Sequence, residues 1–294
     1  MIATLYRAPT ALLALTALMW AMNAMFGQLA VGEISPFTLT LSRWVIVAAV
    51  MWPLFGREVR ENWPTIRAKL PAVVFMSVAG FTAFNSLFYV ASIHTTGVNI
   101  GILQGAIPVM VLIGAIAFQG ERVTARQGLG VAITLAGVIV VACKGDVGVL
   151  LSLAFNHGDL LMMIASIFYS AYTVAIRSRP DVPGAALFTV FAVVAAVTAV
   201  PLAIWETTRP AYEWPTAEGW ALTALVAIFP SCLAQLFFLR GVDLIGPARA
   251  GVYINLVPIF AAILAVIVLG ERFAAFHGLA LALVLGGIWL SQRR

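Results

Sequence analysis

Two stretches of the chain, 150 residues apart, share one pattern. Residues 101–137 read GILQGAIPVMVLIGAIAFQGERVTARQGLGVAITLAG, and residues 251–287 read GVYINLVPIFAAILAVIVLGERFAAFHGLALALVLGG. Aligned without a gap, they share 13 identical residues in 37 positions, which include Pro108 with Pro258 and the triplet Gly-Glu-Arg that starts at Gly120 and at Gly270. Shared hydrophobicity explains matches of Ala and Leu, but it does not explain a charged triplet at one offset. The chain therefore contains an internal duplication.

The composition places the duplicated chain in a lipid bilayer. Of its 294 residues, 62% are hydrophobic and 10% are charged, whereas a soluble domain has roughly 45–50% and about 25%. So few charges cannot cover the surface of a soluble protein. The composition excludes a soluble enzyme, a nucleic-acid binder and a disordered scaffold.

Ten stretches of the chain are long and apolar enough to cross a membrane as α-helices, which need about 20 such residues. We expect them at residues 9–31, 36–55, 70–92, 97–118, 124–143, 157–176, 184–205, 219–239, 247–269 and 274–291. Residues 1–143 then form one five-helix repeat, residues 144–156 a connecting loop, and residues 157–294 the second repeat. The loops are too short to hold a soluble domain such as a nucleotide-driven motor.

Because five is an odd number, the second repeat enters the membrane from the opposite side. The sequence thus predicts an all-α integral membrane protein with two inverted five-helix repeats. Inverted repeats allow two similar halves to exchange inward-facing and outward-facing shapes around a site near the midplane. This arrangement favours a transporter.

The basic residues predict the orientation of the chain. On the side of the N-terminus lie Arg7, Arg57, Arg60, Arg67, Lys69, Arg122, Arg126, Arg177, Arg179, Arg240, Arg249, Arg293 and Arg294. The opposite side has Lys144, Arg209 and Arg272, and Arg43 lies within a span. We therefore expect both termini in the cytoplasm. The net charge of +5 reflects this bias and not a nucleic-acid partner.

The ten spans, the two five-span halves, the proline in the fourth span and the Gly-Glu-Arg that closes it resemble the drug/metabolite transporter superfamily, in its EamA branch. The sequence is also similar to bacterial amino-acid exporters of the YddG type. This resemblance covers essentially the whole chain. It implies a multi-pass protein of a bacterial-type cytoplasmic (inner) membrane. It also implies efflux of small metabolites through a central cavity between the first, third, fourth, sixth, eighth and ninth spans.

Two amides occupy equivalent positions in the two repeats. Asn85 in the third span matches Gln235 in the eighth at the 150-residue offset. Gly80 and Pro230 precede them by five residues, and such helix breaks free backbone groups to which a substrate could bind. Two interpretations remain open for the amides, namely cavity lining and hydrogen bonding between helices.

The first and sixth spans offer aromatic and polar side chains at similar positions. Trp20 and Asn23 share one face of the first span, and Tyr169, Tyr172 and Thr173 lie in the sixth. Aromatic rings with polar groups suit the apolar body and polar ends of a zwitterion. We expect these side chains to line the cavity, with core packing as the alternative.

The fourth and ninth spans combine small residues, amides and prolines. The glycines at 97, 101 and 105 predict close packing against another helix. Gln104, Tyr253 and Asn255 are the candidate substrate-binding residues of these spans. Pro108 and Pro258 are predicted to mark kinks about which the helices rock.

Three further titratable or charged residues are candidates for gating or structural roles. Arg43 lies about seven residues inside its span, so we expect it to snorkel outward or to find an acid or carbonyl groups. It is more typical of an anchor than of a substrate ligand. His94 and Asp159 are expected near the outer interface, where a gate, a pH sensor and a solvated helix end are all compatible with the sequence.

No carboxylate is expected in the middle of a span, which weakens the case for an exporter of cationic drugs. Only Arg43 is available to a phosphate, which would need several buried bases. The sequence therefore favours a neutral or zwitterionic metabolite, above all an amino acid with an apolar or aromatic side chain. We expect facilitated exchange by alternating access, without a buried acid relay.

Other functions remain as alternatives. An exporter of a cationic drug, a purine or a sugar would have the same architecture, and a channel is a further possibility. An enzyme is not expected, because the three histidines are far apart and form no metal-binding pattern. We expect no cofactor and no metal, a monomeric protein, and two partners: an amino-acid-like small molecule and the lipid bilayer.

Overall fold

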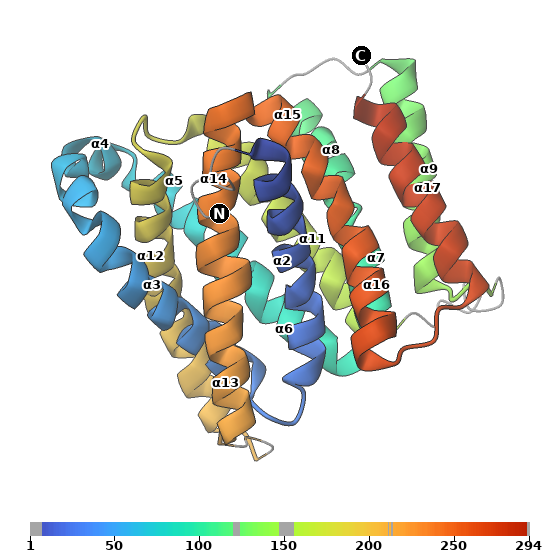
Figure 1. The fold of residues 1–294 in the computed structure, drawn as a ribbon, viewed down its shortest axis with the longest axis horizontal. Helices are drawn as coiled ribbons and strands as arrows, with labels where there is room; N and C mark the ends of the chain where they lie inside the picture. Colours follow the sequence, from blue (N-terminus) through green and yellow to red (C-terminus); the bar gives the residue numbers. More distant parts are fainter. Residues whose placement is uncertain (1–7, 120–123, 147–155, 211, 213, 293–294) are drawn as a thin grey trace.

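The computed structural model describes residues 8–119, 124–146, 156–210, 212 and 214–292. Within these ranges the chain is helical and contains no strand. The helices form one bundle, in which α2 begins and α17 ends at the same end (Figure 1). The predicted all-α membrane fold is confirmed.

The first half of the chain supplies the helices up to α9. Their bounds are α2 (Pro9–Leu29), α3 (Pro36–Glu61), α4 (Trp63–Ala68), α5 (Leu70–Ser77), η1 (Val78–Ala83), α6 (Phe84–His94), α7 (Gly97–Gln104), α8 (Ile107–Gln119) and α9 (Ala125–Ala142). The second predicted span extends beyond residue 55, and α4 occupies the loop predicted after it. Proline at the start of α2 and α3 fits a helix N-terminus, where the missing N–H has no partner to lose.

The second half supplies the helices from α11 onward. They are α11 (His157–Ala175), η2 (Ile176–Ser178), α12 (Gly184–Thr207), α13 (Ala217–Val226), η3 (Ala227–Leu233), α14 (Ala234–Ile245), α15 (Pro247–Val252), η4 (Tyr253–Leu256), α16 (Val257–Leu269) and α17 (Ala275–Gln292). The triplet that starts at Gly120 and most of the predicted connecting loop lie outside the described residues, as do Arg7, Arg293 and Arg294.

Nine helical segments of the described chain are long and apolar enough to cross a membrane. The tenth predicted span forms α17, whose apolar part, Ala275–Leu290, is shorter than the others. Helix α17 packs along α9, its equivalent in the first half, at one edge of the bundle (Figure 1). Each of these two helices has 18 residues. All ten predicted helices therefore form, and the two shortest of them, α9 and α17, pack against each other.

The packing of helices follows a twofold relation between the halves. Helix α3 packs on α12, α7 on α16 and α9 on α17, and each of these contacts joins a pair of equivalent spans, namely the second with the seventh, the fourth with the ninth and the fifth with the tenth. The contact of α2 with α14 is matched by that of α11 with α6, and the contact of α2 with α16 is matched by that of α11 with α8 (Figure 1). Because each half holds an odd number of spans, this is the packing of an inverted repeat.

Four spans are interrupted at equivalent positions in the two halves. The third and eighth contain wide π-helical turns, η1 and η3, which include Gly80 and Pro230. The fourth breaks between α7 and α8, and the ninth breaks at the 3₁₀ turn η4. Pro108 and Pro258 are each the second residue of the helix that follows the break. Proline cannot donate to the preceding turn, so the hydrogen-bond ladder stops there.

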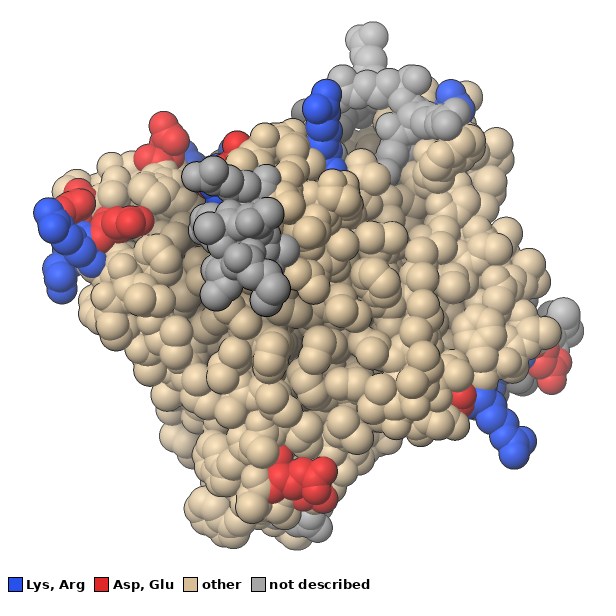
Figure 2. Space-filling model, viewed as in Figure 1, with Lys and Arg blue, Asp and Glu red and all other residues tan. Residues whose placement is uncertain are grey.

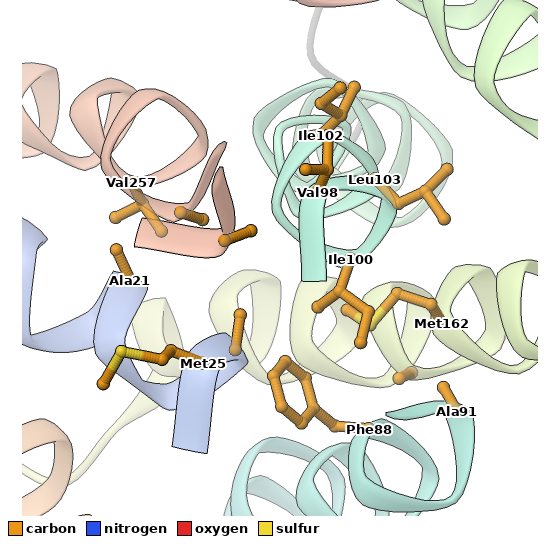
Figure 3. Close-up of a cluster of buried hydrophobic side chains, with 14 of the residues drawn as sticks. Ala21, Met25, Phe88, Ala91, Val98, Ile100, Ile102, Leu103, Met162 and Val257 are labelled. Atoms are coloured by element: carbon orange, nitrogen blue, oxygen red, sulfur yellow. The ribbon is translucent and has the colours of Figure 1, made fainter. Parts of the chain in front are cut away.

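The larger hydrophobic core lies where the halves meet. Figure 3 shows Met25 of α2, Phe88 of α6, Met162 of α11 and Val257 of α16 gathered near Ile100 of α7. Phe88, Ile100 and Met162 are fully buried. In lipid, close packing of this kind contributes much of the attraction between helices. The core therefore holds α7 between elements of both repeats.

Apart from the buried Arg43, the charged side chains of the described residues lie at the two ends of the bundle. In the view of Figure 2 they lie at opposite ends, separated by a broad uncharged band. We call the end at which α2 begins the basic end, because its described charges include Arg57, Arg60, Arg67, Lys69, Arg126, Arg177, Arg179, Arg240 and Arg249. The opposite, acidic end carries Glu33, Asp159, Glu206, Glu218 and Glu271.

The glycines of the fourth span pack closely against other helices, as predicted. A Cβ atom at Gly101 would lie 2.5 Å from Cβ of Ala261 on α16. A Cβ at Gly105 would lie 2.5 Å from Cγ1 of Val284 on α17. Both distances are far below van der Waals contact, so only glycine allows this approach of the backbones.

Two glutamates of the second half cap helices of the first half at the acidic end. The two carboxylate oxygens of Glu271 accept hydrogen bonds from the backbone N–H groups of Gly97 and Val98, at 2.7 and 2.9 Å. Glu206 accepts from the N–H groups of Phe37 and Thr38, at 3.0 and 2.8 Å. A carboxylate is favoured at a helix N-terminus because N–H groups there lack partners within the helix.

We predict that Gly101→Ala destabilises the fold, because the new methyl group forces α7 away from α16. Overpacking of this kind costs about 1–3 kcal/mol. The matched control is Gly251→Ala, at the equivalent position of the second repeat, where a Cβ meets nothing within 4 Å. The control is expected to be neutral or slightly stabilising. Unfolding of both variants by SDS in mixed micelles measures the difference, and equal stabilities would contradict this packing.

We also predict that Glu271→Ala lowers the free energy of unfolding, since two N–H groups of α7 lose a charged acceptor. The expected loss is about 1–3 kcal/mol, and Glu271→Gln should fall between this variant and the native protein. Thermal unfolding in detergent measures the effect. Asp181→Ala, which removes an exposed carboxylate outside any helix, is the control. An equal shift for both alanine variants would argue against the cap.

Candidate functional site

A cavity lies inside the bundle at the level of the four interruptions. It contains about 900 Å³ free of protein atoms, part of it open to solvent. Its walls include residues from the interruptions themselves, namely Gly80, Gly105, Pro108, Pro230 and Pro258. Both halves thus contribute to one site, as expected where broken helices of inverted repeats meet.

The π-helical turns free backbone carbonyl groups, and side chains satisfy them. The carbonyl oxygen of Phe81 accepts from Nε1 of Trp44 at 3.2 Å and from Nδ2 of Asn85 at 2.6 Å. The carbonyl oxygen of Val226 accepts from Oγ of Ser231 at 2.7 Å. We expected these helix breaks to leave backbone groups to which a substrate could bind. The carbonyl groups of Phe81 and Val226 instead accept hydrogen bonds from side chains of the protein.

Arg43 of α3 stands at the centre of a buried polar cluster. Its Nε donates to Oγ of Ser231 at 2.8 Å. Its Nη1 lies within hydrogen-bond distance of Oδ1 of Asn85 at 2.6 Å, the hydroxyl of Tyr89 at 2.7 Å and Oδ1 of Asn23 at 3.1 Å. Arg43 is 5% exposed and lines the cavity. It does not snorkel outward. It is held by amide carbonyls and hydroxyl groups.

Aromatic rings form the wall next to this cluster. The ring of Trp44 lies 5.1 Å from that of Phe81, which lies 5.9 Å from that of Phe188. Phe84 and Tyr169 form a second pair with their ring centroids 4.9 Å apart. All five side chains line the cavity. The cavity therefore has an apolar, aromatic part that adjoins a polar part.

Two amide side chains in the cavity wall have unused hydrogen-bonding capacity. The Nε2 atom of Gln104 is buried and has no hydrogen-bond partner. Gln235 makes no hydrogen bond to any residue that the structure describes, and it also lines the cavity. Buried polar groups without partners are costly in a protein interior. Such groups are suited to bind a polar ligand.

The cavity brings together most of the residues expected from the sequence. It is lined by Trp20, Asn23, Arg43, Asn85, Gln104, Pro108, Tyr169, Gln235, Asn255 and Pro258. Asn85 shows that the two alternatives for the amides were not exclusive, because it lines the cavity and also bonds to α3. Five expected residues lie elsewhere: Tyr172, Thr173, Tyr253, His94 and Asp159.

Three of these five contact other parts of the protein. The ring of Tyr172 packs on the backbone of Gly80, so it supports the cavity from behind. Thr173 donates to the carbonyl oxygen of Tyr169 within its own helix, at 2.9 Å. The hydroxyl of Tyr253 lies 3.3 Å from that of Thr10 at the basic end. The structure therefore places none of the three on the wall of this cavity, and for Tyr172 it shows the core packing that was the alternative.

Asp159 is buried, although the sequence is compatible with a solvated helix end. It is 1% exposed and accepts hydrogen bonds from Thr95 at 2.5 Å and from Asn99 at 3.2 Å. Oδ1 of Asn99 lies 3.2 Å from Nε2 of His277 on α17. His94, by contrast, is exposed. Asp159 thus joins the two halves at the acidic end, outside the cavity.

Some residues of the cavity wall and of the cluster around Arg43 were not predicted from the sequence. Tyr89 lies four residues after Asn85, and Phe81 lies four residues before it. Ser231 lies four residues before Gln235. Residues four apart share a face of a helix. The positions one turn before and one turn after each amide therefore include Phe81, Tyr89 and Ser231. Trp44 is adjacent to Arg43, but no spacing pattern in the sequence indicates that it lines the cavity.

Comparison with known proteins gives transporters as relatives. The chain is 26% identical to the uncharacterized transporter YyaM of Bacillus subtilis over 88% of this chain and 85% of that protein. It is 23% identical to the aromatic amino acid exporter YddG of Ancylobacter novellus over 96% of each chain. It is 24% identical to a probable terminal-alkyne amino-acid exporter of Streptantibioticus cattleyicolor, over 87% of this chain and 84% of that protein.

The fold is also that of a protein of known structure. A crystal structure matches with a TM-score of 0.64 and 21% identity, and the match covers 97% of each chain. The sequence pattern of the EamA-like transporter family matches this chain twice, at residues 9–143 and 156–292. These two matches together span nearly the whole duplicated chain. The protein is a multi-pass membrane transporter that belongs to the EamA-like transporter family.

Proposed function

We propose that the protein exports small neutral or zwitterionic metabolites, above all amino acids with apolar or aromatic side chains. Transport proceeds by alternating access, as exchange down the substrate gradient. In this proposal the basic end faces the cytoplasm of a bacterial-type cell, in accord with the positive-inside rule.

The cavity at the crossing of the interrupted spans is the observation that carries this proposal. Helix breaks contributed by both repeats meet there, so a rotation of one half relative to the other changes the walls of the cavity and its access together. A cavity built by one half alone would not respond in this way. This position of the cavity supports a mechanism of alternating access.

The chemistry of the cavity lining supports a cargo with an apolar body and few charges. Among the described residues that line it, none is acidic, and Arg43 is the one basic residue. A cationic drug would lack a counter-charge, and a phosphorylated metabolite would lack the several basic groups that it needs. Aromatic rings and free amides suit an amino acid better.

Two of the relatives support the same class of cargo. One is named as an exporter of aromatic amino acids and another as a probable exporter of a terminal-alkyne amino acid. Both cargoes combine an amino-acid backbone with an apolar side chain. The aromatic wall of Trp44, Phe81 and Phe188 suits this type of side chain.

Alternating access then requires contacts at the acidic end to separate. Hydrogen bonds from Asn99 to Asp159, from Gln28 to the Thr95 carbonyl and between Asn99 and His277 lie at this end. The two bonds of Asn99 and the glutamate caps connect elements of both repeats, and the bond of Gln28 connects two elements of the first repeat. In the proposed cycle this end opens when the cavity releases its cargo, and the basic end closes.

Counterflow in proteoliposomes tests the proposed function. Vesicles loaded with one unlabelled amino acid should take up labelled phenylalanine, tryptophan or leucine transiently above equilibrium, and the uptake should saturate. The panel also contains small organic cations, purines and sugars. Vesicles with a denatured preparation serve as the control.

Two results would contradict this function. Uptake of no amino acid, with counterflow of a cation or a sugar, would remove the proposed substrate class. Single-channel currents in planar bilayers, together with flux that does not saturate, would show a channel in place of a carrier.

We predict that the double variant Pro108→Ala, Pro258→Ala slows counterflow at least several-fold while the yield of folded protein changes less. Alanine restores the N–H group at each break and allows the helix to continue. The matched control is Pro53→Ala, Pro201→Ala, which alters two prolines inside α3 and α12 that do not line the cavity. If the first pair transported at the native rate, the two prolines would have no role in the movement.

A further inference from the structure

Arg43 has a capacity for binding that the protein leaves unused. An arginine carries five N–H donors, one on Nε and two on each terminal nitrogen. Nε donates to Ser231, and the two hydrogens of Nη1 are shared among Asn85, Tyr89 and Asn23. Within the described ranges, no oxygen accepts from Nη2. One edge of the guanidinium group is therefore held, and another is without a partner.

The charge of Arg43 also lacks a counter-charge. Its partners are two amide oxygens and two hydroxyl groups, all of them neutral. In the described part of the chain the one salt bridge between side chains is the exposed pair of Arg57 and Glu61. Burying an arginine without an acid in a membrane protein is expensive. Such a cost is explained if the charge serves a ligand.

The neutral cluster fixes the guanidinium group in place. Its partners come from α2, α6 and the π-helical turn η3, so elements of both halves hold it. The hydroxyl of Tyr89 donates in turn to Oδ1 of Asn23 at 2.9 Å. A planar donor that is fixed in this way matches the two oxygens of a carboxylate.

The aromatic wall begins next to this charge. Cζ of Arg43 lies 5.0 Å from the centroid of the Trp44 ring, and the rings of Phe81 and Phe188 continue from there. Arg43 and all three rings line the same cavity. A molecule with a carboxylate at one end and an apolar group at the other fits this order of side chains.

We propose that Arg43 is the carboxylate-binding residue of the transport site, with Nη2 donating to the substrate and the aromatic wall holding the substrate's apolar side chain. This inference rests on the proposed function and names the substrate group that the site recognises. Since no described acid lines the cavity, the ammonium group of an amino acid meets only neutral acceptors such as the oxygens of Gln104 and Gln235. Recognition therefore depends on the carboxylate more than on the amine.

Competition on the native protein tests the inference without any substitution. Counterflow of labelled phenylalanine is measured with phenylalanine, 3-phenylpropanoate, phenylalanine amide and phenethylamine as competitors. The two carboxylates should inhibit at similar concentrations. The amide and the amine should need at least tenfold more, because neither offers a carboxylate to Arg43. Equal inhibition by all four compounds would overturn the inference.

Two substitutions test the residue itself. Arg43→Gln should raise the KM for phenylalanine at least tenfold, and Arg43→Lys should raise it less, because lysine keeps the charge and loses the planar fork. Arg60→Gln, which removes an exposed arginine of the basic end, is the control and should keep the native KM. A native KM in Arg43→Gln would overturn the inference.

The outcomes separate this inference from the proposed function. If amino acids undergo counterflow but the amide competes equally well, the carboxylate site fails and the proposed function stands. If no amino acid undergoes counterflow, both fail together. Arg43→Gln could fail to fold because its four neutral partners lose their donor. In that case the competition experiment on the native protein alone tests the carboxylate site.

Discussion

The structure depends on one constraint, which is that hydrocarbon offers no partner to a free backbone N–H or C=O group. Within the described spans, continuous helices satisfy this constraint, and the interruptions are the exceptions. These therefore occur in the interior, where side chains from neighbouring helices replace the missing bonds. Trp44 and Asn85 do so for the carbonyl oxygen of Phe81, and Ser231 does so for that of Val226. The same side chains then hold Arg43 or form the wall next to it. The repair of the broken helices and the construction of the site are thus one arrangement.

The duplicated frame carries a site that is not symmetric. At the 150-residue offset, Phe81 of the aromatic wall corresponds to Ser231, which binds Arg43. Asn23 corresponds to Thr173, and only Asn23 lines the cavity. The two halves therefore share their helix breaks and their packing and differ in the side chains that they present. Symmetry of the backbone supports the exchange of two shapes, whereas asymmetry of the lining gives the cavity a polar end and an apolar end.

Much of the fold could be predicted from the sequence, because span length, the odd number of spans per repeat and the positions of prolines follow from local rules. The site was predicted less well. Asn85, Gln104 and Gln235 were found because a polar side chain within a span is rare. Tyr172 and Tyr253 were misplaced because the sequence does not show which face of a helix meets the cavity. Asp159 was expected near the outer interface, and its burial depends on contacts with Thr95 and Asn99 that lie more than 50 residues away in the chain. The partners of Arg43 come from three other segments, so no local pattern reveals them.

Protection of a single cysteine by substrate tests most directly whether this cavity is the transport site. Cys143 and Cys232 are both buried and would be replaced by serine. One cysteine would then be placed at Ile107, which lines the cavity, and in a second protein at Asn62, which joins α3 to α4. A transported amino acid should slow modification of the cysteine at position 107 by a small thiol reagent, with a concentration dependence that follows the KM, and should leave position 62 unaffected. The account would be contradicted if saturating substrate left the rate of modification unchanged at position 107 as well as at position 62.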